Sequence, residues 1–257
     1  MDLWQMAALA AVQGVSEFLP ISSSGHLTLL EALFGLGEGA LDVGVLLHVG
    51  TLLSVVLYFR RDLAAMLGRS RRLIVPIVVA TIPAVIVVLL LGDWIELAFR
   101  SVLLVGFMLL ITGLLLLGSH RFAPGNRGGL DGIGWRDGLW VGLFQAVAIL
   151  PGISRSGSTI SAGLLRGMDR PLAARFSFLV SVPALVGAAC YEGLRLVRGS
   201  AGITLTPALA AAGLAISFAV GLASIHLLLR IIQRRGIAPF GYYCLGAGLL
   251  AILLGLR

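Results

Sequence analysis

The chain has 257 residues, of which 58% are hydrophobic and only 12% carry a charge. This composition excludes an ordinary soluble domain and is typical of a protein that crosses a membrane several times. The net charge of +7 comes from 19 basic residues that are all Arg, which excludes a lysine-dependent phosphate loop and Schiff-base chemistry. Cys190 and Cys244 both lie in apolar stretches and indicate neither a disulfide framework nor a metal cluster.

Apolar stretches follow one another along the whole chain. The first, residues 3–35, is interrupted at Pro20 and the serines behind it. Six uninterrupted stretches are long enough to cross a bilayer, which takes roughly 20 residues of helix. They are residues 41–59, 73–92, 102–118, 176–194, 207–229 and 237–256. A second interrupted stretch, residues 138–165, lies between the third and the fourth of these and breaks at Pro151.

The two interrupted stretches are predicted to enter the membrane without crossing it. In hydrocarbon, non-helical backbone is tolerated only where it is buried in protein or lines a watery cavity. Each interrupted stretch is therefore interpreted as two half-helices that dip into the membrane and return. The predicted fold is an all-α polytopic membrane protein with six transmembrane helices and two re-entrant helical hairpins.

The two breaks resemble one another, because "LPISSSG" (residues 19–25) and "LPGISRSG" (residues 150–157) share the pattern ISxSG. Ser23 in the first corresponds to Arg155 in the second, an offset of 132 residues. This predicts an internal duplication. Since each half holds an odd number of crossings, the second half enters from the opposite face, as in an inverted-topology repeat. The single membrane domain covers residues 1–257, with its halves at residues 1–120 and 130–257.

The distribution of Arg predicts the orientation, because short cytoplasmic loops collect basic residues. Arg residues cluster in the segments 60–72, 121–136, 166–175 and 230–235. Six alternating crossings place all four segments on one face, with fourteen Arg inside and four outside. We predict that this face is cytoplasmic, that both termini face outward, and that the first hairpin enters from outside.

Polar residues flank the first break at helical spacing. Gln13 and Glu17 are spaced i, i+4 and share a helix face before the break, whereas Ser23 and His26 are spaced i, i+3 and share a face after it. An ionisable side chain near the bilayer centre costs about 3 kcal/mol, so Glu17 and His26 indicate a functional site. Ser22 can cap the second half-helix.

The second break repeats this arrangement around the fixed positive charge of Arg155. The hydroxyl residues around it are Ser154, Ser156, Ser158 and Thr159. Two half-helix N-termini with an Arg between them predict an anion site, most naturally for phosphate. His48 lies in a predicted spanning helix, and its position leaves open whether it is structural or near the site.

At these residues the sequence resembles a known family. The segments "QGVSEFLPISSSGHL" (residues 13–27) and "PGISRSGSTI" (residues 151–160) are similar to the two signature regions of the undecaprenyl-diphosphate phosphatase family, the BacA-type enzymes linked to bacitracin resistance. The resemblance covers the whole chain in length, number of crossings and motif order. It implies an enzyme of the bacterial inner membrane that removes the terminal phosphate from undecaprenyl diphosphate and yields the carrier for peptidoglycan synthesis.

The resemblance also implies site residues. The family's serine nucleophile falls on Ser23, its histidine on His26 and its phosphate-binding arginine on Arg155. The family's first motif pairs a Glu or Gln with a Glu four residues on, here Gln13 and Glu17. The other candidate substrate-binding residues are Ser22, Ser24, Ser154, Ser156 and Thr159.

The expected mechanism is attack of Ser23 on the terminal phosphorus, while His26 or Glu17 takes its proton and Arg155 with the half-helix amides holds the phosphate oxygens. In an alternative, Glu17 or His26 activates water and Ser23 only positions the substrate. Because a diphosphate monoester carries about −3 near neutral pH, a Mg²⁺ or Ca²⁺ ion that bridges Glu17 and the phosphates would offset the excess charge.

The predicted partners are a polyprenyl diphosphate lipid and the lipid bilayer; a homodimer is allowed, and no nucleic acid is expected. The active site is predicted to face the periplasm or outside. The rival function is a secondary transporter or polyprenyl-phosphate flippase, because inverted repeats with broken helices are the architecture of secondary transporters.

Overall fold

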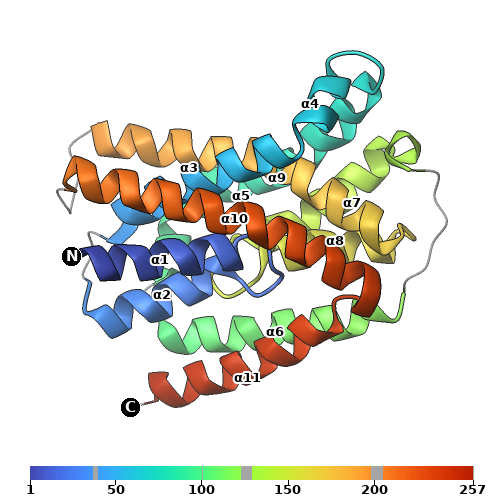
Figure 1. The fold of residues 1–257 in the computed structure, drawn as a ribbon. Helices are drawn as coiled ribbons and strands as arrows, with labels where there is room; N and C mark the ends of the chain where they lie inside the picture. Colours follow the sequence, from blue (N-terminus) through green and yellow to red (C-terminus); the bar gives the residue numbers. More distant parts are fainter. Residues whose placement is uncertain (37–39, 100, 123–128, 198–204, 257) are drawn as a thin grey trace.

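The computed structural model describes residues 1–36, 40–99, 101–122, 129–197 and 205–256, and the regular structure in these parts is entirely helical. The α-helices (Figure 1) are α1 (Leu3–Ser16), α2 (Ser23–Phe34), α3 (Ala40–Tyr58), α4 (Arg60–Met66), α5 (Ile74–Phe99), α6 (Val102–His120), α7 (Trp135–Val147), α8 (Arg155–Leu165), α9 (Arg170–Val197), α10 (Pro207–Arg235) and α11 (Ala238–Gly255). Two short 3-10 turns are η1 (Arg71–Leu73) and η2 (Leu130–Gly132). The predicted all-α fold is confirmed.

By length and composition, five helices can cross a membrane, and a sixth crossing is counted if α3 and α4 form one bent span. The two helices of this pair meet at Phe59 and are bent by 72°. The first predicted crossing, residues 41–59, agrees with α3 within one residue at each end, and it counts as a crossing together with α4. Three helices, α5, α9 and α10, also run past the predicted ranges 73–92, 176–194 and 207–229, because charged residues near a helix end lower the hydropathy without ending the helix.

Both chain termini lie at one end of the molecule (Figure 1). At the other end lie α4, the start of α7, the start of α9 and the turn between α10 and α11. The Arg-rich segments in these parts therefore share one end, as the predicted alternation requires. Which end faces the cytoplasm stays a prediction. The orientation was predicted from a count of Arg on each face. Four of the counted residues, Arg100, Arg127, Arg198 and Arg257, lie outside the described residues.

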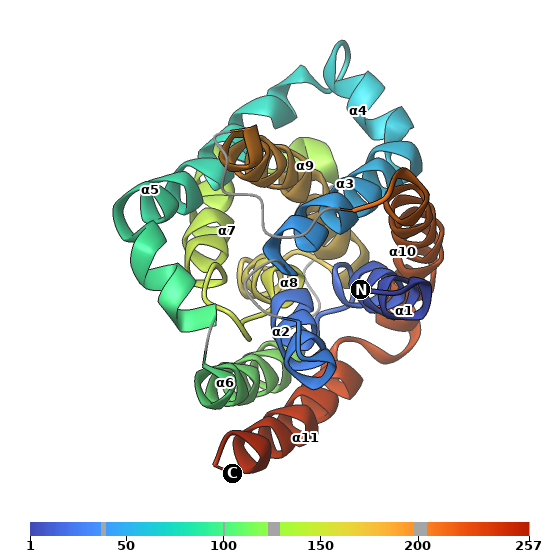
Figure 2. The ribbon, with the colours of Figure 1, turned by 90° about the vertical axis from the view of Figure 1, so that its left-hand side faces the viewer.

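The interrupted stretches form two helix pairs that start from opposite ends. The pair α1 and α2 occupies the end with the termini, whereas α7 starts at the Arg-rich end (Figure 1). Figure 2, which looks along the bundle, shows α2 and α8 near its centre. This arrangement fits two hairpins that enter from opposite faces. Their re-entrance into a bilayer and the division into halves at 1–120 and 130–257 stay predictions.

Glycines allow the helices around these pairs to approach closely, as is typical of membrane helices. A Cβ on Gly106 of α6 would lie 3.0 Å from the carbonyl oxygen of Gly248 on α11, and a Cβ on Gly248 would lie 2.8 Å from that of Gly106. Gly113 and Gly241 face each other in the same way, at 2.9 and 3.1 Å. The backbones of α6 and α11 are therefore in direct contact at these glycines.

Candidate active site

The first break leads from the end of α1 to the start of α2. Glu17 is the C-cap of α1. The chain then runs through Pro20 to Ser23, the first residue of α2. Ser22 is the N-cap of α2, and its Oγ accepts a hydrogen bond from the Gly25 N–H over 3.3 Å. Its hydroxyl also lies 3.2 Å from that of Ser24. The predicted serine cap is confirmed.

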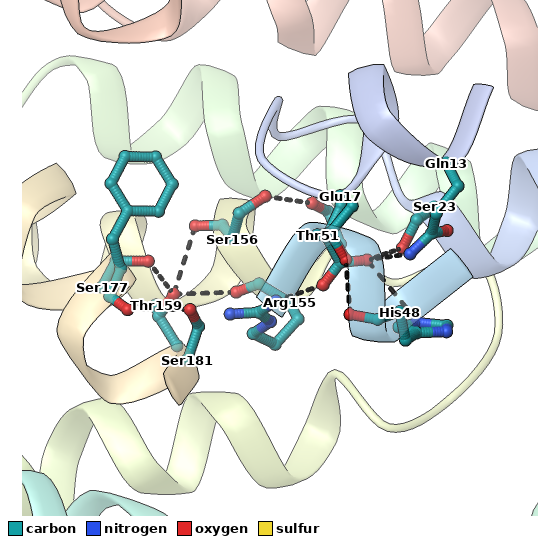
Figure 3. Close-up of polar contacts among 12 residues, drawn as sticks. Gln13, Glu17, Ser23, His48, Thr51, Arg155, Ser156, Thr159, Ser177 and Ser181 are labelled. Carbon is teal, nitrogen blue, oxygen red and sulfur yellow. Dashed lines mark hydrogen bonds and ion pairs between the residues drawn. The ribbon is translucent and has the colours of Figure 1, made fainter. Parts of the chain in front are cut away.

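Glu17 is the centre of polar contacts that come from both breaks (Figure 3). The Ser23 hydroxyl donates to Glu17 Oε2 over 2.7 Å, and Gln13 Nε2 donates to the same oxygen over 3.1 Å. Arg155, at the start of α8, pairs with Glu17 Oε1 through its guanidinium. The structure thus brings together four of the predicted site residues.

The ion pair between Glu17 and Arg155 is largely withdrawn from solvent, because their side chains are only 5% and 17% exposed. Removing charges from water costs several kcal/mol per ion, so each of the two needs a charged partner. A guanidinium also matches the oxygens of a phosphate with its planar fork of donors. Arg155 can therefore exchange the carboxylate of Glu17 for an incoming phosphate.

The second break is fixed by hydrogen bonds to its backbone. Gly152 has φ +93°, a conformation that favours glycine. The Thr112 hydroxyl on α6 donates to the Gly152 carbonyl oxygen over 3.0 Å and accepts from the Ser154 N–H over 3.1 Å. Ser154 then caps α8, because its Oγ accepts from the Gly157 N–H over 3.0 Å. Arg155 consequently occupies the first position of a firmly held helix.

Two further hydroxyls that were predicted to bind substrate hold the protein together in this structure. Ser156 Oγ donates to the Leu19 carbonyl oxygen over 3.1 Å and so ties α8 to the first break. Thr159 Oγ1 lies 2.5 Å from Ser177 Oγ on α9 (Figure 3). Both side chains are buried. Their position beside the site is as predicted, and their contact with substrate stays a prediction.

His26 is not directed at Ser23, although α2 places the two residues one turn apart as predicted. The His26 Nδ1 atom lies 2.8 Å from the Ser22 carbonyl oxygen, and Nε2 lies 2.8 Å from the Tyr243 hydroxyl on α11. Both ring nitrogens therefore have partners other than the Ser23 hydroxyl. Of the two proposed proton acceptors, the structure places Glu17 and not His26 against the Ser23 hydroxyl.

His48, on α3, is a neighbour of the site whose role the sequence left open. Its Nε2 atom lies 3.7 Å from Glu17 Oε2, and its Nδ1 lies 2.7 Å from the Gly44 carbonyl oxygen. One turn further along α3, the Thr51 hydroxyl donates to the His48 carbonyl oxygen over 3.0 Å (Figure 3). Polar residues spaced i, i+3 on an apolar spanning helix are the signal that could have placed α3 at the site.

Glu17 and Gln13 are the residues of the predicted site that could offer oxygen atoms to a cation. Glu17 and Gln13 carry oxygen donors, which Mg²⁺ and Ca²⁺ prefer, and the buried Gln13 Oε1 has no hydrogen-bond partner in the described structure. Within the described ranges, no group of three or more His, Cys, Asp or Glu could hold a metal ion. A bound phosphate and water would have to supply the remaining donors.

Comparison with known proteins identifies the family of the chain. A family model described as "Bacitracin resistance protein BacA" matches residues 6–250. A protein of Rhodopirellula baltica named undecaprenyl-diphosphatase is 43% identical over 258 residues, which cover 100% of this chain and 99% of the relative. Proteins of the same name from Desulfosudis oleivorans and Methanosphaera stadtmanae are 41% and 38% identical, with at least 98% of each chain covered. The chain therefore belongs to the BacA family.

Proposed function

We propose that this protein hydrolyses undecaprenyl diphosphate to undecaprenyl monophosphate and phosphate. The observation that carries the proposal is the contact of Glu17 with both Ser23 and Arg155. Phosphoryl transfer needs a nucleophile, an acceptor for its proton, and positive charge for the phosphate oxygens. These three residues supply one each, and the names of the relatives support the choice of substrate.

In the first step, Ser23 Oγ attacks the terminal phosphorus and the anhydride P–O bond breaks, which forms a phosphoserine. Glu17, which already accepts the serine hydroxyl at 2.7 Å, takes the proton and passes it to the departing lipid monophosphate. A carboxylate paired with a guanidinium is a weak base. Because the substrate phosphate competes for Arg155, its arrival loosens this pair and makes Glu17 a better proton acceptor.

In the second step, water attacks the phosphoserine. Glu17 takes a proton from the water and returns it to Ser23 Oγ as inorganic phosphate leaves. In the alternative mechanism, Glu17 activates water for direct attack and Ser23 only positions the diphosphate. Acid quenching during turnover with substrate labelled in its terminal phosphate separates the two, because only the first mechanism leaves label on the protein.

A Mg²⁺ or Ca²⁺ ion is proposed as the cofactor, with Glu17 and Gln13 as its protein ligands. Bound there, the cation would neutralise part of a substrate charge of about −3 near neutral pH. Chelation should abolish phosphate release, and either cation should restore it. Gln13→Leu should raise the cation concentration needed for half-maximal activity; an unchanged requirement would remove Gln13 as a ligand.

We place the activity in the bacterial inner membrane with the site open to the outside, where it would recycle the lipid carrier for peptidoglycan synthesis and confer bacitracin resistance. The family description and the shared end of the Arg-rich segments support this. In a cysteine-free background, Thr206→Cys should react with an impermeant thiol reagent on intact cells, and Arg69→Cys should not. The reverse result would invert the orientation. A homodimer stays a prediction.

The test of the function is phosphate release from a long-chain prenyl diphosphate by the purified protein in detergent. Ser23→Ala and Arg155→Ala are its negative controls. A transporter or flippase cannot be assayed as such without a membrane, but it would not hydrolyse the lipid. Failure of the wild-type protein to release phosphate in the presence of divalent cations would overturn the proposal and favour that rival.

A further inference from the structure

Tyr243 on α11 contacts His26 on α2 across 217 residues of sequence. The Tyr243 hydroxyl lies 2.8 Å from His26 Nε2, and the two rings stack at 14° with their centroids 5.6 Å apart. This pair is separate from the contacts between Ser23, Glu17 and Arg155. It has therefore no part in the mechanism described above.

The contacts of His26 define its tautomer. The Nδ1 atom lies 2.8 Å from the Ser22 carbonyl oxygen, which can only accept a hydrogen bond, so Nδ1 carries the proton. In a neutral imidazole Nε2 then offers a lone pair, and the Tyr243 hydroxyl donates to it. The imidazole is consequently held at both nitrogens, by the backbone of Ser22 on one side and by α11 on the other.

The backbone that His26 holds is strained. Ser22 has φ +71° and ψ +97° and is the single non-glycine residue with positive φ among the described residues. Such a conformation persists only where its surroundings hold it, and it is typical of functional sites. The Ser22 carbonyl oxygen accepts both the His26 side chain and the His26 N–H, the latter over 3.2 Å. Ser23, the proposed nucleophile, is the next residue.

The helix that carries Tyr243 is a firm support. Its glycines pack against the backbone of α6, as described above. The next residue, Cys244, is buried and its Sγ donates to the Pro20 carbonyl oxygen over 3.5 Å. Helix α11 therefore contacts the first break at two consecutive residues, on either side of the strained Ser22.

We propose that Tyr243 is a positioning residue, which acts through His26 on the backbone of Ser22 and so keeps the Ser23 hydroxyl directed at Glu17. The inference rests on the proposed function in taking Ser23 as the nucleophile. In the described structure the Tyr243 hydroxyl bonds His26 and none of Ser23, Glu17 and Arg155. Loss of its hydroxyl should therefore slow the chemical step and leave substrate binding nearly unchanged.

The test variant is Tyr243→Phe, which keeps the stacked ring and removes only the donor. The control is Tyr242→Phe, because Tyr242 is 68% exposed and its hydroxyl has no hydrogen bond to a described residue. In the detergent assay, Tyr243→Phe should lower kcat about tenfold and change KM by less than about twofold. Tyr242→Phe should behave as wild type.

A second measurement reports the contact directly and does not depend on turnover. Imidazole 15N spectra, with His26 assigned by its loss in His26→Gln, should show a protonated Nδ1 and a hydrogen-bonded Nε2 in the wild type. In Tyr243→Phe the Nε2 resonance should move toward that of a free lone pair, and in Tyr242→Phe it should not. An unmoved resonance would overturn the contact, even if the wild-type protein proved to have no phosphatase activity.

A double variant separates action through His26 from a general effect on the fold. If Tyr243 works through His26, Tyr243→Phe should cause no further loss of kcat in the His26→Gln background. Multiplicative losses in the double variant would overturn the inference, as would wild-type kcat in Tyr243→Phe. Absence of phosphate release from the wild type would refute the proposed function instead, and the spectra would still decide whether Tyr243 holds His26.

Discussion

The two breaks of the chain are built on the same plan. In each, a serine caps the half-helix that follows, and a side chain from α6 or α11 donates to a carbonyl oxygen of the turn. Thr112 donates to Gly152 over 3.0 Å, and Cys244 donates to Pro20 over 3.5 Å. Cys244 lies 132 residues after Thr112, and Gly152 lies 132 residues after Pro20. The same offset separates Ser23 and Arg155. This correspondence supports the predicted repeat.

The turns themselves differ in how the backbone is accommodated. The second break has Gly152 at φ +93°, where glycine carries no steric penalty. The first has no glycine in its turn and places Ser22 at φ +71°, at a cost of about 1–3 kcal/mol. The relaxed turn precedes the fixed charge of Arg155, and the strained turn precedes the proposed nucleophile Ser23.

The brace on the strained turn has no counterpart in the other break. The positions that correspond to His26 and Tyr243 are Ser158 and Ile111, which cannot form an imidazole–phenol pair. A nucleophile has to be held within about 0.5 Å of its productive geometry, whereas a long guanidinium tolerates more freedom. The two breaks therefore differ in the side chains that support their backbones as well as in their chemistry.

The largest effect should follow from removing the Ser23 hydroxyl, which only the first break supplies. Ser23→Ala should lower kcat by at least about 10³-fold, because no other hydroxyl donates to Glu17 in the described structure. Single-turnover phosphate release measures the loss. The matched control is Ser24→Ala, which removes a neighbouring hydroxyl and should keep activity within about tenfold of wild type. Substantial turnover by Ser23→Ala would exclude the phosphoserine mechanism.

Next in size is the loss of the group that only the second break supplies. Arg155→Lys keeps the charge but not the planar fork, so kcat/KM should fall by about 10²- to 10³-fold. Arg166→Lys is the matched control, because Arg166 pairs with Asp137 and not with Glu17. Near-normal kinetics of Arg155→Lys would argue against a role of Arg155 in holding phosphate.

Exchanging the backbone properties of the two turns should separate stability from activity. A Cβ at Gly152 would lie 2.5 Å from the Val105 carbonyl oxygen, so Gly152→Ala should destabilise the protein by roughly 3 kcal/mol and lower Tm in detergent by several degrees. Ser22→Gly removes the strain together with the serine cap of α2, and Gly replaces such a cap at a cost of only a few tenths of a kcal/mol. Tm should therefore be unchanged or raised, while kcat falls about tenfold because the turn loses its fixed direction. A drop in Tm for Ser22→Gly would contradict the assignment of strain.

Sequence reasoning reached those parts of the site that depend on local spacing. The breaks at Pro20 and Pro151 and the serine caps follow from local spacing and from the cost of charge in hydrocarbon, and the matching motifs placed Arg155 and Glu17 in one site. The order of the crossings follows from hydropathy for the same reason. These features are encoded within windows of a few residues or by the correspondence of the two motifs.

The parts that sequence reasoning missed depend on how distant helices pack. In the sequence, Tyr243 is one aromatic residue within an apolar stretch, and no local pattern connects it with His26. The spacing of Ser23 and His26 suggested a shared role, but the imidazole is drawn to α11 by partners that only the fold supplies. The 72° bend after α3 was missed because hydropathy does not report direction.

The smallest expected effect concerns the contact that ties the second break to α6. Thr112→Val keeps the shape of the side chain but leaves the Gly152 carbonyl oxygen and the Ser154 N–H without their partner. The loss should be about 1 kcal/mol, since hydrogen bonds in membrane proteins are modest and the unfolded state also finds partners. A Tm lower by a few degrees in detergent would report it. Thr81→Val is the matched control, because the Thr81 hydroxyl only bonds the Ile77 carbonyl oxygen of its own helix. If Thr112→Val left Tm unchanged but lowered kcat, the prediction would be wrong. The Thr112 contact would then act on the direction of Arg155 and not on stability.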